Sequence, residues 1–479
     1  MSERTSLDPA DWDSLRAQGR RMLDDMFDHL QGLRDQPAWR PIPEALRAQH
    51  RTPPPRAPEP VADIHATFLS DVLAYGGGNL HPGFMGWVQG AGTPVGMLAE
   101  MLAGGLNANL GGRDHMPIEI EREVVGWMRQ LFGFPPGASG LMVTGASMAN
   151  FIGVLIARQC ALGAAGRARG VGEARLTAYA STGMHGCVPR AMEMAGLGAE
   201  ALRTVPVDES RRIDLTALEG MIAEDRRSGL RPFLLVGSAG TVDTGAIDDL
   251  DALADLAIRE GLSFHVDGAY GALGVLTPEI APRLKGIERA DTLAFDFHKW
   301  GHVPYDAGFL LARDGELHRQ TFAAPAAYLQ RETRGLAGGD FWPCDYGPDL
   351  SRGFRALKTW FTLKALGLDA LGASIERSCA LARALEARVR QAPELELQAP
   401  AALNIVCFRY VCDDADTVNR AIVADLHEAG RVAPSLTRIG GATAIRAALF
   451  NHRTDVRDIE ALVDGVIAFG RARTRGDAA

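Results

Sequence analysis

SFHVDGAYGALGVLTPEIAPRLKGIERADTLAFDFHKW, residues 263–300, is the stretch of sequence that decides the fold. It holds two short apolar runs, SFHV (263–266) and TLAF (292–295), which have the length of buried strands. The residues that close the two runs are costly to place in a core: His265, Asp267 and Gly268 at the first, then Asp296, His298 and Lys299 at the second. In an open parallel sheet, the loops at the carboxyl ends of the strands form the ligand crevice. We therefore expect these side chains to line one site.

Lys299 is the candidate nucleophile of that site. A buried lysine loses its charge readily, and its free amine forms a Schiff base with an aldehyde. Enzymes that use the aldehyde pyridoxal phosphate also place an Asp beside the pyridine nitrogen, which keeps this nitrogen protonated. We interpret Lys299 as the residue that binds the cofactor and Asp267 as the partner of the ring nitrogen. Each motif alone has a simpler explanation, because an Asp after a strand often caps a helix.

HVDGAYG (265–271) followed by DFHKW (296–300) resembles the group II pyridoxal-phosphate-dependent amino-acid decarboxylases. This family includes aromatic-L-amino-acid, histidine and glutamate decarboxylases, and the resemblance covers nearly the whole chain. It implies an α/β chain of fold type I with pyridoxal 5′-phosphate as cofactor, and it places Ala269, Asp296 and His298 beside that cofactor. The implied reaction converts an L-amino acid, an aromatic one first, to the amine and carbon dioxide. An aliphatic or acidic substrate, an aminotransferase reaction and an oxidative decarboxylation to an aldehyde remain alternatives.

Length and pattern indicate several domains. A chain of 479 residues, 47% of them hydrophobic and 23% charged, is predicted to form two or three globular domains. Strand and helix patterns alternate from about residue 140 to 315, which favours a mostly parallel sheet covered by helices. We place the boundaries so that an N-terminal helical dimerisation segment (1–92) precedes a large cofactor-binding domain (93–367) and a small α+β domain (368–479).

Charge and cysteine usage argue against several classes of partner. A net charge of −9 does not favour nucleic acid or an anionic membrane, which attract clustered Lys and Arg. The six Cys include no CxxC pair, so we expect reduced thiols in a cytoplasmic protein, and the polar amino terminus lacks a signal peptide's apolar core. The most apolar stretch, 140–157, is interrupted by Thr144, Ser147 and Asn150, so no membrane span is expected. No metal site is predicted.

The N-terminal segment predicts a subunit contact. Apolar residues recur at helical spacing from Asp11 to Leu33, and the Pro-rich stretch 51–60 should be extended and exposed. The helix has no packing partner within its own segment. In the resembling family this layer packs against a second subunit, which implies a homodimer with active sites at the interface. The alternative is that the helix packs on its own chain.

Two aromatic residues are candidates for the substrate pocket. HPGFMG (81–86) resembles a family segment that lines this pocket, so we expect Phe84 and Trp87 to form an aromatic wall. Aromatic residues in loops are as often simply part of the core. GRDHMP (112–117) departs from the aromatic decarboxylases, and this departure leaves the substrate open.

The run GLMVTGAS (140–147) predicts the phosphate site. It reads as a strand, a turn of small residues and the start of a helix, whose free N–H groups face an anion. Gly145, Ala146 and Ser147 are therefore assigned to the cofactor phosphate. Such turns are common, and the assignment depends on their match to the family's phosphate turn.

The resemblance assigns further residues along the chain. His185 matches the His that stacks on the pyridine ring, although a His at a helix start is often only structural, and Thr241 matches a position next to the ring. The Gly- and Pro-rich segment 321–347 is predicted to be a loop that acts as a lid. Its Tyr328 matches the tyrosine that returns a proton to the α-carbon, or it only anchors the loop. Arg446 alternates with apolar residues and either meets the substrate carboxylate or pairs with an internal acid.

Overall fold

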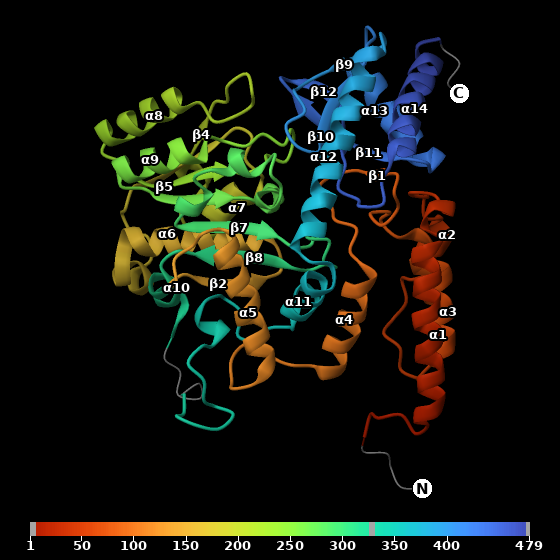
Figure 1. The fold of residues 1–479 in the computed structure, drawn as a ribbon, viewed down its shortest axis with the longest axis horizontal. Coiled ribbons are helices and arrows are strands. Elements are labelled where there is room, and N and C mark those ends of the chain that lie inside the picture. The colour runs from red at the N-terminus through yellow and green to blue at the C-terminus, as the bar shows by residue number, and fades with distance from the viewer. Residues whose placement is uncertain (1–5, 325–330, 476–479) are drawn as a thin grey trace.

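The computed structural model describes residues 6–324 and 331–475. In Figure 1 a large sheet with its helices forms one side of the molecule, and a small C-terminal sheet and a column of N-terminal helices form the other. Helix α12 (Leu368–Gln391) runs between the two sheets. The architecture is α/β, as the alternation of patterns in the sequence predicts.

The large sheet is mostly parallel. Within the described residues its strand order is β2-β8-β7-β6-β5-β3-β4. The pairs from β7 to β4 are parallel, whereas β8 is antiparallel to both β7 and β2. Its strands are β2 (Ser139–Val143), β3 (Leu176–Ser181), β4 (Leu202–Val205), β5 (Arg231–Ser238), β6 (Ser263–Asp267), β7 (Thr292–Asp296) and β8 (Gly308–Ala312).

Helices cover both faces of this sheet. On one face Gly153 of helix α6 lies against His265 of β6, and on the other Gly237 of β5 lies against Leu253 of α9. In β3, for example, Ala178 and Ala180 enter one hydrophobic cluster and Tyr179 between them enters another. The helices of this region are α4 (Pro94–Leu106), α5 (Met116–Leu131), α6 (Ala146–Arg169), α7 (Cys187–Met194), α8 (Leu215–Arg227), α9 (Leu250–Glu260), α10 (Gly315–Phe322) and α11 (Arg355–Leu366).

The register of the strands brings their polar ends together. Ser238, the last residue of β5, pairs with Asp267, the last residue of β6. Asp267 in turn pairs with Ala294 of β7, two residues before Asp296. The carboxyl ends of three neighbouring strands thus meet at one edge of the sheet.

The small sheet contains a strand from the N-terminal segment. Its order in the described part of the chain is β1-β11-β12-β10-β9, and β1 (Phe84–Met85) is parallel to β11. The segment 1–92, expected to be helical, thus also contains this strand, and two residues are too short a run to be recognised as a strand in the sequence. The remaining elements are β9 (Leu395–Leu397), β10 (Ile405–Tyr410), α13 (Ala415–Ala429), β11 (Ala433–Ile439), β12 (Ala442–Ala448) and α14 (Val456–Arg475).

The N-terminal helices α1 (Trp12–Gln31), α2 (Glu44–Gln49) and α3 (Val61–Thr67) stand beside the body of the chain (Figure 1). Helix α1 has no buried residue, and its Trp12 side chain is 58% exposed. The segment is tied to the small domain by Arg34, which forms ion pairs with Asp455 and Asp458. Trp12, Leu15 and Met22 of α1 are thus left exposed by the described residues of their own chain, whereas the apolar residues of its second half are partly buried.

Helix α6 is long and apolar enough to cross a membrane by length and composition, and no other described helix is. It packs against strands β5 to β8 and contributes residues such as Ile152 and Val154 to the buried core. This packing explains its apolar character.

Candidate active site

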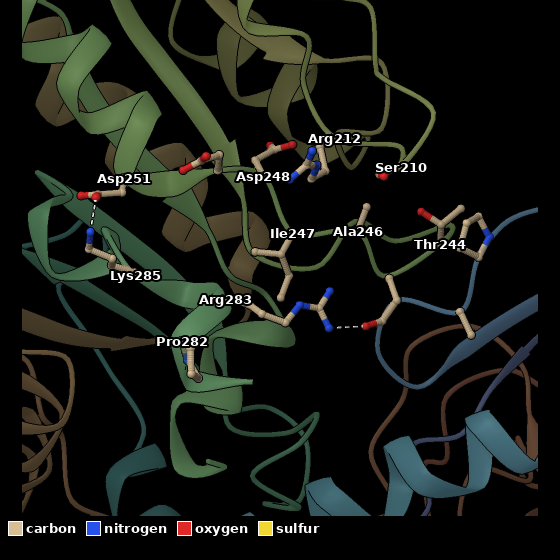
Figure 2. A pocket seen from close by; sticks show the side chains of 14 residues that line it. Ser210, Arg212, Thr244, Ala246, Ile247, Asp248, Asp251, Pro282, Arg283 and Lys285 are labelled. Carbon is tan, nitrogen blue, oxygen red and sulfur yellow. Dashed lines mark hydrogen bonds and ion pairs between the residues drawn. The ribbon is translucent and has the colours of Figure 1, made fainter. Parts of the chain in front are cut away.

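Two cavities among the described residues have the size of a small-molecule site. The first has a volume of about 780 Å³ and lies between the large domain and the segment 400–402 (Figure 2). Its acidic groups are already engaged: Asp248 accepts the N–H groups of Ile213 and Ser238, and Asp251 pairs with Lys285 at 2.7 Å. No candidate nucleophile of the sequence analysis lines this cavity.

The second cavity, of about 560 Å³, lies where β5, β6 and β7 end. Its volume falls within the range of about 300–1,000 Å³ that small-molecule sites occupy. The structure brings most of the predicted site residues to its wall: Trp87, Gly145, Ala146, Ser147, His185, Thr241, Asp267, Ala269, Asp296, His298, Lys299 and Arg446. This cavity is the candidate active site.

Asp296 organises the nucleophile. Its Oδ2 lies 2.8 Å from Nζ of Lys299 and 3.5 Å from Nε2 of His298, and its Oδ1 accepts the N–H of Ala146 at 2.6 Å. The Asp296 carboxylate is 3% exposed and the Lys299 side chain 17%. His298 accepts the N–H of Ala307 at Nδ1, which leaves Nε2 to carry the proton toward Asp296. The lysine is therefore held in one orientation, with its amine at the cavity.

Asp267 is a second buried carboxylate on the wall of the same cavity. Burial raises the pKa of Asp267, while the charge of Lys299 and the hydrogen bond from the N–H of Ala269 (3.1 Å) act in the opposite direction. A carboxylate with a raised pKa binds a proton strongly. It is suited to share one with a basic ring nitrogen.

The N-terminus of α6 faces the cavity between these groups. Gly145 precedes the helix, Ala146 is its first residue, and the exposed Ser147 follows. The N–H of Ala146 is taken by Asp296, so the other N–H groups of this turn and the positive end of the helix dipole are what make the position suited to a phosphate. The hydroxyl of Thr241 is already bound, since it accepts the N–H of Ala246 at 3.0 Å and contacts the hydroxyl of Thr244 at 3.1 Å.

His185 presents an exposed imidazole to the cavity. Its Nδ1 accepts the N–H of Cys187 at 3.1 Å, so a proton on the neutral ring resides at Nε2. Cys187 itself lines the cavity, and burial raises the pKa of its thiol to about 12, so the thiol is neutral. Neither feature of Cys187 was predicted.

The structure places the two aromatic candidates for the substrate pocket in different surroundings. Trp87 lies on the cavity wall and is half exposed. Its backbone N–H donates to the hydroxyl of Ser435, and its φ of 49° lies in the left-handed region, which is strained for such a residue. Phe84 does not line the cavity. It is buried with Ala38 and Ala433, and its ring lies 6.2 Å from that of Trp87. The expectation that Phe84 forms part of the wall is corrected: in strand β1 it points into the core behind Trp87.

Arg446 lines the cavity without an ion pair to any acid of the described residues. Its guanidinium donates to the carbonyl of Asp243 (3.3 Å), the hydroxyl of Ser435 (3.2 Å) and the carbonyl of Val242. Burial lowers its pKa. The predicted alternative of pairing with an internal acid is therefore not what the described structure shows, and a buried cation remains at the wall.

Tyr328 falls in the segment 325–330, outside the described residues. Sequence reasoning missed Tyr305, which lines the cavity with its ring centroid 4.2 Å from that of His298. Burial and the nearby charge of Asp296 raise the pKa of Tyr305 to about 12. Its place six residues after Lys299, in the turn before β8, was the available signal.

The donor set fits pyridoxal phosphate. The cofactor requires an amine for its aldehyde, an acid for its ring nitrogen and N–H donors for its phosphate. Lys299, Asp267 and the N-terminus of α6 supply these groups around one cavity. His185 and Thr241 lie at the same wall, where they would meet the ring.

Comparisons with known proteins agree with this chemistry. Residues 43–411 match the family model described as the pyridoxal-dependent decarboxylase conserved domain. The chain is 33% identical to an aromatic-L-amino-acid decarboxylase of Bacillus atrophaeus, over 96% of this chain and 95% of the relative, and 27% identical to one of Catharanthus roseus, over 95% and 93%. The structure of Catharanthus roseus tryptophan decarboxylase with L-tryptophan superposes with a TM-score of 0.86 at 25% identity, covering 97% of this chain and 99% of that one. The chain therefore belongs to the pyridoxal-dependent decarboxylases and is a pyridoxal-phosphate-dependent amino-acid decarboxylase.

Proposed function

We propose that this protein decarboxylates an aromatic L-amino acid and releases the corresponding amine and carbon dioxide. The observation that carries the proposal is the indole of Trp87, which stands on the wall of the cavity that also holds Lys299 and Asp267. An aromatic side chain packs favourably against such a ring. The 33% identity to the aromatic-L-amino-acid decarboxylase of Bacillus atrophaeus supports the same substrate class.

Each site residue has a separate task. Pyridoxal phosphate, when bound, supplies a ring that accepts the electrons left behind when the carboxylate departs. Lys299 provides the amine that holds the cofactor, and Asp296 fixes the direction of that amine. Asp267 keeps a proton at the pyridine nitrogen. Gly145, Ala146 and Ser147 surround the phosphate end, and His185 covers one face of the ring.

Arg446 and Tyr328 complete the proposal on the substrate side. Arg446 is a buried cation at the cavity wall whose hydrogen-bond partners are neutral oxygens, and a substrate carboxylate would supply the ion pair that these partners do not. The phenol of Tyr328, by resemblance, returns a proton to the α-carbon. Retention of this tyrosine favours an amine as product over an aldehyde.

The proposal is tested with purified protein, pyridoxal phosphate and a panel of L-amino acids. Tryptophan, tyrosine, phenylalanine and 3,4-dihydroxyphenylalanine form the aromatic arm, and histidine, glutamate and leucine form the comparison arm. Carbon dioxide and amine are measured together, along with aldehyde, ammonia and keto acid. Equal carbon dioxide and amine from the aromatic arm is expected. Turnover confined to the comparison arm would overturn the substrate class, and keto acid or aldehyde as the main product would overturn the reaction.

We also propose a cytoplasmic homodimer with active sites at the subunit interface. Apolar side chains are exposed on the N-terminal helices and on α4, where Met101 and Leu106 are both more than half exposed. A separate, smaller cavity of about 250 Å³ lies between α1 and Tyr305. Tyr305 also lines the active-site cavity. A second copy that covers α1 would thus close the outer side of the site. The free cysteines agree with a reducing compartment.

A further inference from the structure

A chain of buried polar side chains runs beneath the active-site cavity. The hydroxyl of Thr292 contacts Nδ1 of His265 at 2.7 Å, and Nε2 of His265 contacts Oδ1 of Asn150 at 2.6 Å. Nδ2 of Asn150 donates to Sγ of Cys187 at 3.2 Å. All four side chains are buried, and Asn150 and His265 are each only 1% exposed. The chain connects four different elements: β7, β6, α6 and α7.

With the Asn150 amide oriented as it is in the structure, the donors and acceptors of this chain match one another. Because Nδ2 of Asn150 donates to Cys187, the carbonyl oxygen Oδ1 faces His265 and accepts from it. Nε2 of His265 therefore carries the ring proton, and Nδ1 accepts the hydroxyl proton of Thr292. Burial lowers the pKa of His265 to about 4, so the ring stays neutral in this arrangement near neutral pH. Every ring nitrogen has its partner.

Each member of the chain stands next to a group of the cofactor site. Asn150 lies one turn after Ala146 on α6, and His265 lies two residues before Asp267, on the same face of β6. At the other end, the backbone N–H of Cys187 donates to Nδ1 of His185. The chain thus joins the phosphate end, the acid for the ring nitrogen and the imidazole that covers the ring.

The imidazole of His265 also sets the spacing between β6 and α6. A Cβ atom added to Gly153 would lie 2.7 Å from the ring, and 3.3 Å from the hydroxyl of Thr292, so the helix approaches the strand as closely as the imidazole permits. The absence of a side chain at this position is what lets the two elements meet. The distance between the N-terminus of α6 and Asp267 therefore depends on a ring held by two hydrogen bonds.

We propose that Asn150 and His265 are positioning residues that fix the separation between the phosphate end and the ring-nitrogen end of the cofactor site. They touch the helix, the strand and Cys187 rather than the reacting atoms. Removal of the Asn150 amide breaks its hydrogen bond to His265 on β6 and its hydrogen bond to Cys187 on α7. The cofactor then binds to groups that are no longer held at matched distances.

The inference rests on the cofactor site and is independent of the substrate proposed above. Its test therefore measures binding of pyridoxal phosphate alone, by titration of the full-length protein freed of cofactor and by the absorption band of the bound cofactor from pH 6 to 9. Asn150→Ala is expected to raise the dissociation constant about tenfold, as loss of an orienting outer partner commonly does at metal sites, and to shift the pH dependence of the band. The matched control is Asn419→Ala. Asn419 is also fully buried and hydrogen-bonded, but to Tyr410 and Ala415 in the small domain. This control should lower the melting temperature and leave cofactor binding unchanged.

A second pair of variants decides the question if Asn150→Ala does not fold. Thr292 lies at the far end of the chain and does not line the active-site cavity. Thr292→Val keeps the shape but removes the hydroxyl, whereas Thr292→Ser keeps the hydroxyl but loses a methyl group. Weaker cofactor binding in the Val variant only is the expected result. Binding that is unchanged in the Val variant, or weakened equally in both, would show that the chain stabilises the fold without positioning the site.

Discussion

Nζ of Lys299 lies 2.8 Å from Oδ2 of Asp296, and the second oxygen of the same carboxylate accepts the N–H that begins helix α6. One carboxylate thus contacts both the amine that holds the cofactor and the helix end that faces its phosphate. The contact holds Nζ of Lys299 against the carboxylate, whereas attack on an aldehyde needs this nitrogen to be free. Asp296 therefore orients the nucleophile at some expense of its reactivity.

Asp296→Asn is expected to make the amine of Lys299 more reactive. The amide keeps an acceptor for the N–H of Ala146 but removes the negative charge 2.8 Å from the ammonium group. Labelling of the cofactor-free variant at Lys299 by trinitrobenzenesulfonate, followed by peptide mapping at pH 7.5, should be several-fold faster than in the wild type, since one charge contact at this distance is worth on the order of 1 kcal/mol or more. Asp306→Asn is the control, because Asp306 pairs with Arg355 instead. Equal labelling rates in all three proteins would contradict the role assigned to Asp296.

Lys299→Ala is expected to abolish covalent attachment of the cofactor. Borohydride treatment of the wild-type holoprotein should fix the cofactor on the peptide that contains residue 299, and the variant should carry no label there. Amine production should fall by at least about a thousandfold, as it does when a nucleophile is removed. Lys364→Ala, on helix α11, is the control and should behave as wild type. A label on another lysine of the wild type would refute the assignment.

The strands of the large sheet could be predicted from the sequence because their ends are sharp. SFHV and TLAF were expected as buried strands and lie in β6 (Ser263–Asp267) and β7 (Thr292–Asp296), since a buried parallel strand is a continuous apolar run that stops where polar residues begin. The same rule located Asp267 and Lys299 at strand ends that meet in space. Strand β1 had no such signal, because Phe84 and Met85 are recognisable as a strand only when Ala433 and Pro434 lie beside them.

The network around the site could not be predicted from the sequence. Asn150 and His265 are 115 positions apart in the chain, and nothing in either segment shows that their side chains are 2.6 Å apart. The direction of the Phe84 side chain could not be predicted either. The segment around it is rich in Gly and Pro and has no regular periodicity, so its sequence does not show which side chains face the core. Sequence patterns define faces of regular elements, whereas contacts between elements depend on how those faces are stacked.

Trp87→Ala is expected to weaken binding of aromatic substrates. The indole stands half exposed on the cavity wall, and stacking of an aromatic ring on it contributes about 1 kcal/mol beyond the buried area. KM for the preferred aromatic amino acid should rise about five- to tenfold with a smaller change in kcat, and Trp87→Phe should restore most of the loss. Steady-state kinetics of both variants checks this. An unchanged KM in the Ala variant would remove Trp87 from the substrate pocket.

A charge on the apolar surface of α1 is expected to dissociate the proposed dimer. The Trp12 side chain is 58% exposed in the single chain, and an aspartate at this position would be costly to bury against a second copy. Trp12→Asp should shift the mass measured by light scattering from two chains toward one, and it should lower activity if the interface closes the site. Ile258→Asp is the matched control, because Ile258 is 72% exposed on α9 in the large domain. A wild-type protein that is monomeric at micromolar concentration would contradict the proposed dimer.

His318→Gln is expected to make the stability of the protein less sensitive to acid. His318 is fully buried, with Nδ1 2.8 Å from the hydroxyl of Ser139 and Nε2 2.6 Å from the carbonyl of Tyr346. Burial lowers its pKa from 6.5 to about 4, so between these values the unfolded chain binds a proton at this position that the folded chain does not. The contribution of the neutral His318 to the free energy of unfolding is therefore fully present above pH 6.5. It decreases by about 3 kcal/mol in total as the pH falls to about 4. Urea unfolding at pH 7.5, 6 and 5 should give a smaller loss of unfolding free energy for the glutamine variant than for the wild type. Parallel curves for the two proteins would mean that His318 does not remain neutral in the folded state.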